Sequence, residues 1–318
     1  MVEEKKSSLI SDVAGLSSPI TKLIETIGSG IGQLAKPWQT KRNAKADAEA
    51  IQTISKTLNE TLGEVTYNTP NFSITVKNDC IEETIISRLV NQEIDRQFNL
   101  KDIISETAAI LETKEQVSEE PVSKDWTTRF ISIAQDISNA ELKNLWAQIL
   151  AGEIEHPNSF SLRTLDLLKN ISQDEAEKIQ NIYKCCLQDF YGNNYIFGYI
   201  NSLESMGISF SDALILDELN LCKSDLVYTI SKKQGTYFKV GNTNNLIMIT
   251  NETEADINMP CIKLTKIGNQ IFNITNVEYK NDDIVALLEF LRQNKKLKFE
   301  LIDVTELSCQ SDSIHEIC

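Results

Sequence analysis

Histidine, glycine and proline are scarce in this sequence of 318 residues, which contains 2 histidines, 12 glycines and 6 prolines. So little glycine and proline excludes collagen-like and low-complexity chains. With two histidines, metal sites and nucleophilic triads that depend on imidazole are disfavoured. Hydrophobic residues make up 41% of the chain and charged residues 24%, a composition typical of a globular protein.

The seven cysteines show no metal-binding or redox pattern, because no two of them have the Cys-x-x-Cys spacing. Residues 1–6 lack the apolar core of a signal peptide. We therefore expect free thiols in a cytoplasmic protein, with no metal and no cofactor. The alternative is a zinc site formed by Cys309, His315 and Cys318, but structural zinc usually takes four protein ligands.

Positive charge is also in short supply. The chain has 31 Lys and Arg residues against 46 Asp and Glu residues, which gives a net charge of −15. A chain this acidic repels a phosphate backbone unless its basic residues gather locally, so general coating of nucleic acid is disfavoured. No uninterrupted apolar run reaches the roughly 18 residues that span a bilayer.

Hydrophobic periodicity predicts a mostly α protein in four segments. Residues 1–63 form an amphipathic helical hairpin, 64–124 a linker and a helical pair, and 125–190 a central helical bundle. Residues 191–318 form a smaller C-terminal α+β domain, whose order of helix, small hairpin sheet and helix is similar to a winged helix.

Two capping boxes mark helix starts in the predicted bundle. They are Ser138-Asn-Ala-Glu141 and Ser172-Gln-Asp-Glu175, in which the serine and glutamate satisfy each other's backbone donors. The helix that begins at the second box is expected to continue to about Phe190. Farther along the chain, the period changes toward two residues and predicts strands at 225–230, 237–240, 246–249 and 297–304.

The predicted first helix is amphipathic and carries three glycines, each of which costs about 1 kcal/mol of helix propensity relative to alanine. Gly28-x-x-x-Gly32 is a small-x-x-x-small pair that allows another helix to approach closely. An interfacial tryptophan and basic residues follow, as in membrane-surface helices. The predicted self-association or membrane face consists of Ile20, Leu23, Ile24, Ile27, Gly28, Ile31, Gly32 and Trp38. A second subunit, the rest of this chain or a bilayer could cover it.

Glu153 continues an apolar helical stripe that contains Trp146, Ile149 and Leu150. A carboxylate on such a face needs a partner, because burying it unpaired costs several kcal/mol. We expect a structural ion pair between Glu153 and Arg163, with Arg129 as a second candidate.

A basic patch of the C-terminal half consists of Arg292, Lys295, Lys296 and Lys298. In a winged helix these residues could contact nucleic acid, although a cluster of cations at a helix C-terminus is more often a solvated helix end. The sequence contains no nucleophile elbow, acidic metal motif or glycine-rich nucleotide loop in a fitting context. We therefore infer no small-molecule substrate, and an enzyme is not favoured.

Two stretches resemble known proteins. The segment Leu145-Trp-Ala-Gln-Ile-Leu-Ala-Gly-Glu-Ile154, followed by Ser159-Phe-Ser-Leu-Arg-Thr-Leu165, resembles an uncharacterised bacterial domain family of unknown function. Arg96-Gln-Phe-Asn99 is similar to a segment of helical abortive-infection proteins. The resemblance covers roughly residues 9–190 and implies a bacterial, mostly helical protein with a role in phage defence. It brings no catalytic residues with it.

The sequence thus favours a non-enzymatic helical interaction protein that forms a homo-oligomer, or binds a protein partner, through its N-terminal hairpin. Peripheral contact with the inner membrane face is an alternative for the same helix. A second hypothesis is a regulator that binds nucleic acid through the C-terminal domain. The third is an enzyme whose site is assembled from distant residues.

Overall fold

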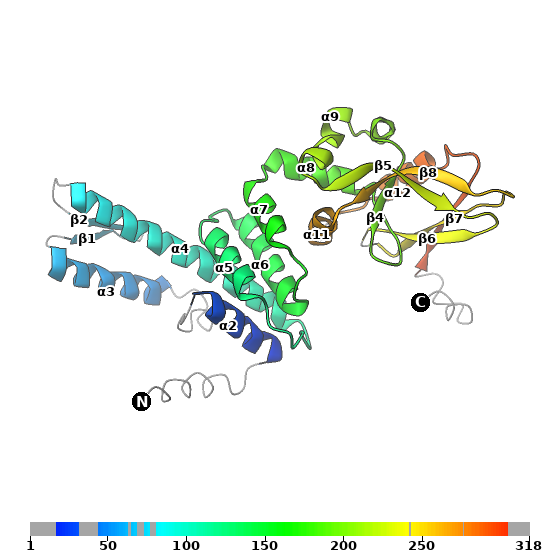
Figure 1. Cartoon of the computed structure of the whole chain (residues 1–318). Helices are drawn as coiled ribbons and strands as arrows, with labels where there is room; N and C mark the ends of the chain where they lie inside the picture. The colour runs from blue at the N-terminus through cyan, green and yellow to red at the C-terminus, as the bar shows by residue number, and fades with distance from the viewer. Residues whose placement is uncertain are drawn as a thin grey trace. The chain divides into compact units, whose positions relative to one another are not determined.

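A computed structural model shows the chain as two compact units, Met1–Leu165 and Asp166–Cys318, here called unit 1 and unit 2 (Figure 1). The structure describes residues 17–31, 44–62, 65–68, 73–76, 81–241, 243–275 and 277–304. Each unit has its own hydrophobic core.

Unit 1 is built from helices and one small hairpin. Its described helices are α2 (Ser18–Ile31), α3 (Ala44–Leu62), α4 (Ile81–Glu112), α5 (Lys124–Ala134) and α6 (Ala140–Glu155), and α7 (Leu162–Asn170) runs across the boundary to unit 2. Strands β1 (Val65–Asn68) and β2 (Ser73–Val76) pair antiparallel, so the linker between α3 and α4 is a β-hairpin. The helical pair predicted within residues 64–124 is one continuous helix, α4.

The core of unit 1 lies where α2, α4, α5 and α6 meet. Trp126 stacks on Phe130 with ring centroids 5.1 Å apart, and Phe130 contacts Trp146 at 5.4 Å. Helix α6 begins at Asn139, whose side chain accepts hydrogen bonds from the backbone N–H groups of Glu141 and Leu142. The N-cap is therefore one residue later than the predicted capping box places it.

Unit 2 contains a sheet and short helices. The strands are β3 (Leu187–Gln188), β4 (Asn194–Phe197), β5 (Cys222–Ile230), β6 (Gly235–Val240), β7 (Asn245–Thr250), β8 (Ile257–Leu264) and β9 (Lys298–Asp303). The helices are α8 (Gln173–Tyr183), the 3-10 helix η1 (Ile200–Met206), α9 (Phe210–Ala213), α10 (Ile215–Glu218), α11 (Lys266–Ile274) and α12 (Asn281–Leu291). The predicted capping box of Ser172 and Glu175 begins α8.

All seven strands of unit 2 form one antiparallel sheet in the order β5-β8-β4-β3-β6-β7-β9. The prediction of a small winged-helix-like domain is therefore wrong, because the sheet is too large for a wing. The central strands β3 and β4 were not predicted from the sequence. Every residue of Asn194–Phe197 is buried, so β4 shows no alternation of apolar and polar residues.

The end of α8 was also predicted wrongly. The helix stops at Tyr183, and Leu187 pairs with both Tyr195 on β4 and Val240 on β6. The intervening apolar residues Cys185 and Cys186 suit a buried helix and a buried strand equally well. Pairing with strands that come later in the chain decides between them.

An aromatic cluster fills one side of this sheet. Tyr195, Phe197, Tyr228 and Phe238 contact one another, mostly edge to face, with centroids 5.1 to 6.3 Å apart. Helix α12 packs Ile284, Leu287, Leu288 and Leu291 into the same core. Burial is the main cause that raises the pKa of the Tyr195 hydroxyl to about 12, and the neighbouring Asp189 carboxylate adds to it.

Candidate functional site

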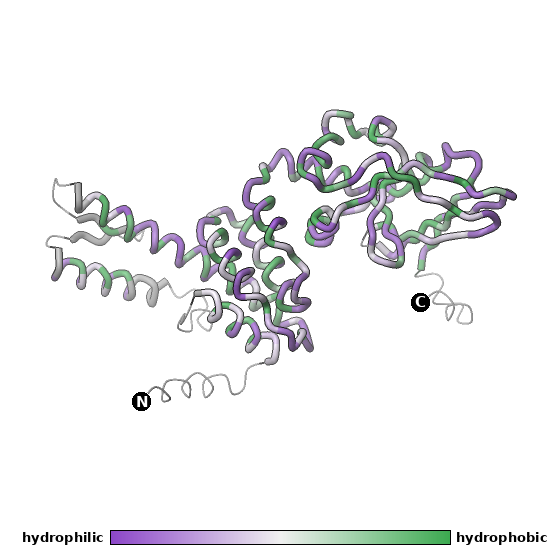
Figure 2. The backbone as a smooth tube through the Cα atoms, in the orientation of Figure 1, coloured by the Kyte–Doolittle hydropathy of each residue, from purple (hydrophilic) through white to green (hydrophobic). Residues whose placement is uncertain are grey.

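The helical arm of unit 1 comprises α3, the β1–β2 hairpin and residues 81–98 of α4. Figure 1 shows α3 and α4 extending from the hairpin, with α3 packed on β1 and α4 on β2. Asn91 fastens β2 to α4, because its side-chain amide accepts from Ile74 N at 2.8 Å and donates to Ile74 O at 2.9 Å. Figure 2 shows apolar and polar residues alternating along both helices.

The core of the arm is small. Among the described residues it consists of Ile51, Ile74 and Ile94, with Leu58, Val90 and Phe98 packed against them and only partly buried. Small hydrophobic cores rarely stabilise a structure without further support. The arm therefore leaves apolar surface that its own helices do not cover.

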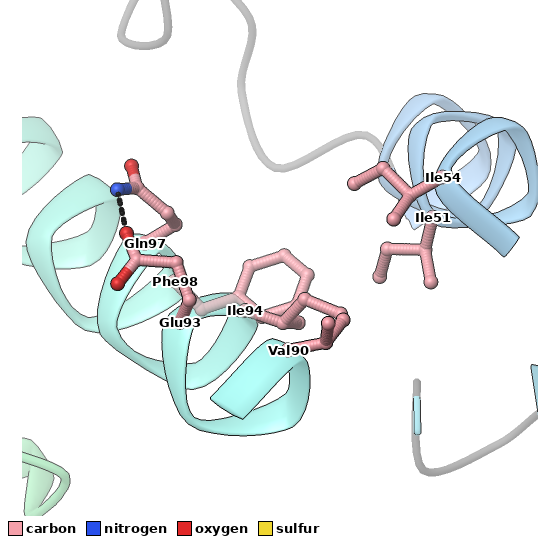
Figure 3. Close-up of a pocket in the computed structure, with 7 residues that line it drawn as sticks. All are labelled: Ile51, Ile54, Val90, Glu93, Ile94, Gln97 and Phe98. Carbon is pink, nitrogen blue, oxygen red and sulfur yellow. Dashed lines mark hydrogen bonds between the residues drawn. The ribbon is translucent and has the colours of Figure 1, made fainter. Parts of the chain in front are cut away.

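That surface forms a groove of about 330 Å³ between α3 and α4 (Figure 3). Its lining residues are Ile51, Ile54, Val90, Glu93, Ile94, Gln97 and Phe98. The ionisable side chain among them is Glu93, whose Oε1 accepts a hydrogen bond from Gln97 Nε2 at 2.8 Å. Apolar walls with one carboxylate offer no acid–base pair or metal ligand set. The groove is chemically suited to contact rather than to catalysis.

Exposed apolar side chains also occur on the arm. Ile54, Ile85 and Leu89 are 42%, 42% and 54% exposed. Ile85 and Leu89 lie one turn apart on α4, next to Ile86 and Val90, so the apolar arc of this helix is wider than one covered face requires. Contiguous exposed apolar surface is typical of interaction sites.

Sequence reasoning missed this groove, although two signals were available. Ile51, Ile54 and Leu58 recur at helical spacing on α3. The adjacent apolar pairs Ile85–Ile86 and Leu89–Val90 widen the stripe of α4. Neither signal shows that the two helices face each other, because that depends on the β1–β2 hairpin.

The Arg96-Gln-Phe-Asn99 motif lies at the base of the groove. Arg96 Nε pairs with Asp136 Oδ1 at 2.8 Å, and Asn99 Nδ2 donates to Gln135 O at 3.0 Å. These contacts join α4 to the end of α5, while Phe98 lines the groove. The motif thus holds the arm on the helices of the unit 1 core.

A family model described as a protein of unknown function (DUF2806) matches residues 83–288, which is more than half of the chain. The chain belongs to the DUF2806 family. No curated protein and no solved structure matches it. The expected membership of an uncharacterised family of unknown function is therefore confirmed. The part that matches DUF2806 includes the α4 wall of the groove, whereas Ile51 and Ile54 of the α3 wall lie before it.

Part of the predicted association face on α2 is covered by this chain itself. Ile20, Leu23 and Ile27 are buried, and α2 packs against α4, α5 and α6. Ile24 is half-buried, and Gly28 is exposed. Gly32, Trp38 and the side chain of Ile31 lie outside the described residues. The sequence left open whether a second subunit, the rest of this chain or a bilayer covers this face. For Ile20, Leu23 and Ile27, the rest of the chain does so.

Close helix approach within unit 1 occurs at Gly30. A Cβ atom there would lie 2.6 Å from Thr127 Cγ2 and 2.7 Å from Ile131 Cδ1, both on α5. A Cβ atom at Gly28 would meet nothing within 4 Å. The glycine that the fold of unit 1 requires is thus Gly30, and a role for Gly28 in association stays a prediction.

Glu153 is 1% exposed, as expected for a residue that continues an apolar stripe. Its Oε1 accepts from Asn158 N at 2.7 Å, and its Oε2 accepts from Phe160 N at 2.8 Å. Hydrogen bonds from backbone N–H groups to a carboxylate are charge-assisted and offset part of its desolvation. Glu153 therefore shapes the loop after α6. Arg163 is exposed, and its pairing with Glu153 stays a prediction.

The basic patch lies at the end of α12 and the start of β9, and Arg292, Lys295, Lys296 and Lys298 are all exposed. Two of the four have local partners. Lys298 Nζ pairs with Glu300 at 2.7 Å, which raises the pKa of the lysine, and Arg292 Nη2 donates to Phe299 O at 3.3 Å. The described residues of unit 2 do not form the winged helix through which this patch was expected to contact nucleic acid.

The described cysteines are buried and free: Cys185, Cys186, Cys222 and Cys261. Burial raises the pKa of the Cys185 thiol to about 12 and that of Cys186 well above its ordinary value, so both stay protonated and unreactive. The described residues contain no group of three His, Cys, Asp or Glu side chains placed to hold a metal. Cys309, His315 and Cys318 lie outside them.

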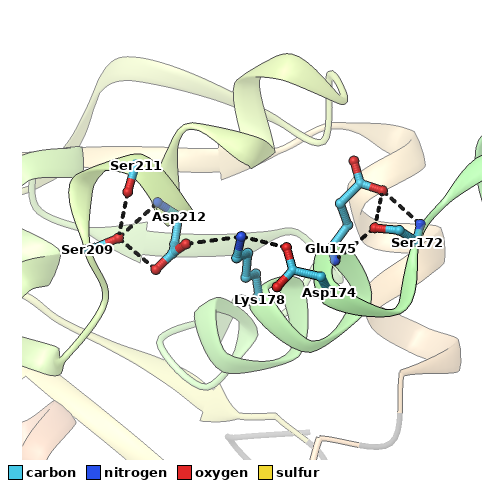
Figure 4. Close-up of polar contacts among 7 residues, drawn as sticks. All are labelled: Ser172, Asp174, Glu175, Lys178, Ser209, Ser211 and Asp212. Carbon is cyan, nitrogen blue, oxygen red and sulfur yellow. Dashed lines mark hydrogen bonds and ion pairs between the residues drawn. The ribbon is translucent and has the colours of Figure 1, made fainter.

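Polar contacts of unit 2 join α8 to α9 (Figure 4). Lys178 Nζ lies 2.7 Å from Asp174 Oδ2 and 3.5 Å from Asp212 Oδ1. Ser209 Oγ donates to Asp212 Oδ2 at 2.6 Å, which holds the pKa of that carboxyl below its usual value. Lys178 thus bridges a carboxylate of each helix, which is typical of a structural contact.

Across the part of the chain that the structure describes, no helix is both long and apolar enough to cross a membrane.

Alanine substitutions at Gly28 and Gly30 should act in opposite directions. Gly28→Ala should raise the free energy of unfolding of unit 1 by about 0.5–1 kcal/mol, because alanine favours the helix and meets open space. Gly30→Ala gains the same propensity but overpacks Thr127 and Ile131, at about 1–3 kcal/mol. Denaturant titration followed by Trp126 and Trp146 fluorescence measures both, and equal effects would contradict the assigned packing.

Replacing Glu153 by glutamine should loosen the loop after α6. Glutamine keeps the shape but places an NH₂ group where one of the two backbone N–H donors needs an acceptor. We expect unit 1 to lose about 1–3 kcal/mol of stability. Glu155→Gln is the matched control, because its partly exposed ion pair with Lys114 at 3.0 Å should contribute less than about 1 kcal/mol. A loss for Glu155→Gln as large as that for Glu153→Gln would count against this role.

Proposed function

We propose that this member of the DUF2806 family is a non-enzymatic interaction protein that self-associates through its helical arm. In the proposed dimer, the groove between α3 and α4 faces the same groove of a second copy. The observation that carries the proposal is the apolar groove itself, whose wall includes the exposed side chain of Ile54.

Geometry supports a second copy as the occupant. Two helices from each chain make a four-helix bundle, an arrangement that gives an apolar helix pair a complete core. A contact of one groove with its own copy is isologous and closes at two subunits, so it does not propagate into a filament. The small core of Ile51, Ile74 and Ile94 would then be enlarged by the partner's arm.

Charge supports the same choice. Two chains of net charge −15 repel each other over most of their surfaces, so they can meet only where few charges gather. The groove offers such a place, because Glu93 is the ionisable side chain in its lining and already accepts a hydrogen bond from Gln97. Glu93 and Gln97 would form part of the polar rim of the interface.

We extend the proposal to a role in bacterial phage defence. Its support is the similarity of Arg96-Gln-Phe-Asn99 to abortive-infection proteins. The motif fastens the arm to the rest of unit 1 through Asp136 and Gln135. A defence role would therefore depend on the arm and on the contact that it makes.

Sedimentation velocity of the full chain tests self-association. The unsubstituted chain should be a dimer at micromolar concentrations. Ile54→Glu introduces a carboxylate from each copy into the interface and should weaken association at least 100-fold. The control is Leu142→Glu, because Leu142 on α6 is 41% exposed against 42% for Ile54 but lies outside the groove. A monomeric parent chain, or equal weakening by both substitutions, would refute the proposed interface.

Plaque assays on bacteria that express the chain test the defence role. Phage plating should fall with the unsubstituted chain and with Leu142→Glu, and should recover with Ile54→Glu, because that change breaks the contact. Unaltered plating of a broad phage panel by the parent chain would refute defence. Protection by Ile54→Glu equal to that by the parent chain would show that defence does not require the arm contact. The sedimentation result stands apart from both outcomes.

A further inference from the structure

A second apolar cavity lies on unit 2, independent of the arm and of the function proposed for it. It has a volume of about 240 Å³ and is here called the aromatic cup. Its lining residues are Gln188, Asp189, Phe190, Tyr237, Lys239 and Leu246. Small-molecule sites typically measure about 300–1,000 Å³, so the cup fits one side chain better than a cofactor.

The sheet forms the floor of the cup. Gln188, Lys239 and Leu246 occupy one cross-strand row, because Gln188 pairs with Lys239 and Lys239 pairs with Leu246. Tyr237 lies two residues before Lys239 and so points to the same face. Phe190 stands against Tyr237 edge to face, with centroids 6.5 Å apart.

The wall of the cup is a tight turn that holds two aromatic side chains in solvent. Asp189 Oδ1 accepts from Tyr191 N at 2.9 Å and from Asn193 N at 2.8 Å, and Gly192 adopts φ 77°. Phe190 and Tyr191 are 64% and 91% exposed. Aromatic residues presented on an ordered turn are typical anchors of protein interfaces, because they lose little conformational freedom on binding.

The charged side chains that line the cup are Asp189 and Lys239. The Asp189 carboxylate is occupied by the amides of its own turn, including Asn193 Nδ2 at 3.0 Å. Lys239 is exposed, and within the described part of the chain no ion pair involves it. An apolar cavity beside one unpaired ammonium group complements an apolar side chain next to a carboxylate. A phosphate backbone needs several cations together, which this surface does not offer.

We propose that the aromatic cup binds an acidic peptide segment that carries one bulky apolar side chain. The apolar side chain enters the cup and packs against Phe190, Tyr237 and Leu246, and a neighbouring carboxylate pairs with Lys239. Tyr191 then packs along the peptide outside the cup. Unit 2 is on this view a peptide-binding unit, joined to a unit 1 that self-associates.

The test is fluorescence anisotropy of the full chain with a labelled Glu-Glu-Phe-Glu-Glu peptide. Binding should weaken at least tenfold when the peptide phenylalanine becomes alanine, and at least tenfold when Lys239 becomes glutamate. Lys232→Glu is the matched control, since Lys232 is equally exposed but lies in the β5–β6 turn, and it should leave binding within twofold. Both lysines are on the surface, so neither change should alter the near-UV circular dichroism.

A charge exchange distinguishes a specific pair from general attraction. A Lys-Lys-Phe-Lys-Lys peptide should bind the Lys239→Glu chain at least tenfold more tightly than the parent chain. Methyl NMR should place either bound peptide at Leu246. Equal weakening by Lys239→Glu and Lys232→Glu would overturn the proposal. So would no binding at millimolar peptide, or tighter binding of oligothymidylate than of the acidic peptide.

Discussion

Helix α4 (Ile81–Glu112) runs through both the arm and the core of unit 1. The rest of unit 1 depends on which elements pack against each half of this helix. Over its C-terminal half, Leu100, Ile103, Ile104 and Leu111 are buried against the neighbouring helices. Over its N-terminal half, the helix packs on β2 and lines the groove that it forms with α3. Apolar residues thus occur along both halves of this helix of 32 residues, and those in the arm have less cover from the described part of the chain.

The polar contacts of unit 1 keep that arm in place. Arg96 and Asn99 join α4 to the end of α5, Asn91 joins it to β2, and Lys143 on α6 pairs with Asp102 on α4 at 2.8 Å. Partly exposed pairs of this kind contribute little free energy but fix orientation. The groove is therefore presented as a defined surface, which lowers the conformational cost of binding a second copy.

Unit 2 presents apolar surface in a different way. Helix α12 and the aromatic cluster cover one face of the sheet, and the opposite face of β6 and β7 carries the half-exposed Tyr237 and Leu246. The same turn that gives β3 its pairing with β4 exposes Phe190 and Tyr191. The two units thus offer surfaces of different chemistry, an apolar groove with one carboxylate, Glu93, and an aromatic cup that Asp189 and Lys239 flank.

The sequence by itself determined the helices of unit 1, the capping box at Ser172, the burial of Glu153 and the strands β5, β6, β7 and β9, because helical and two-residue periods are local signals. Membership of a family of unknown function was also expected from the sequence and is confirmed. Only the tertiary structure decided that Leu187–Gln188 is a strand, that Gly30 rather than Gly28 meets α5, and that α3 faces α4 across a groove. Each of these outcomes depends on a partner distant in the chain. The hydrophobic pattern of a strand buried on both faces, or of a helix that packs by close approach, does not predict which distant element it contacts.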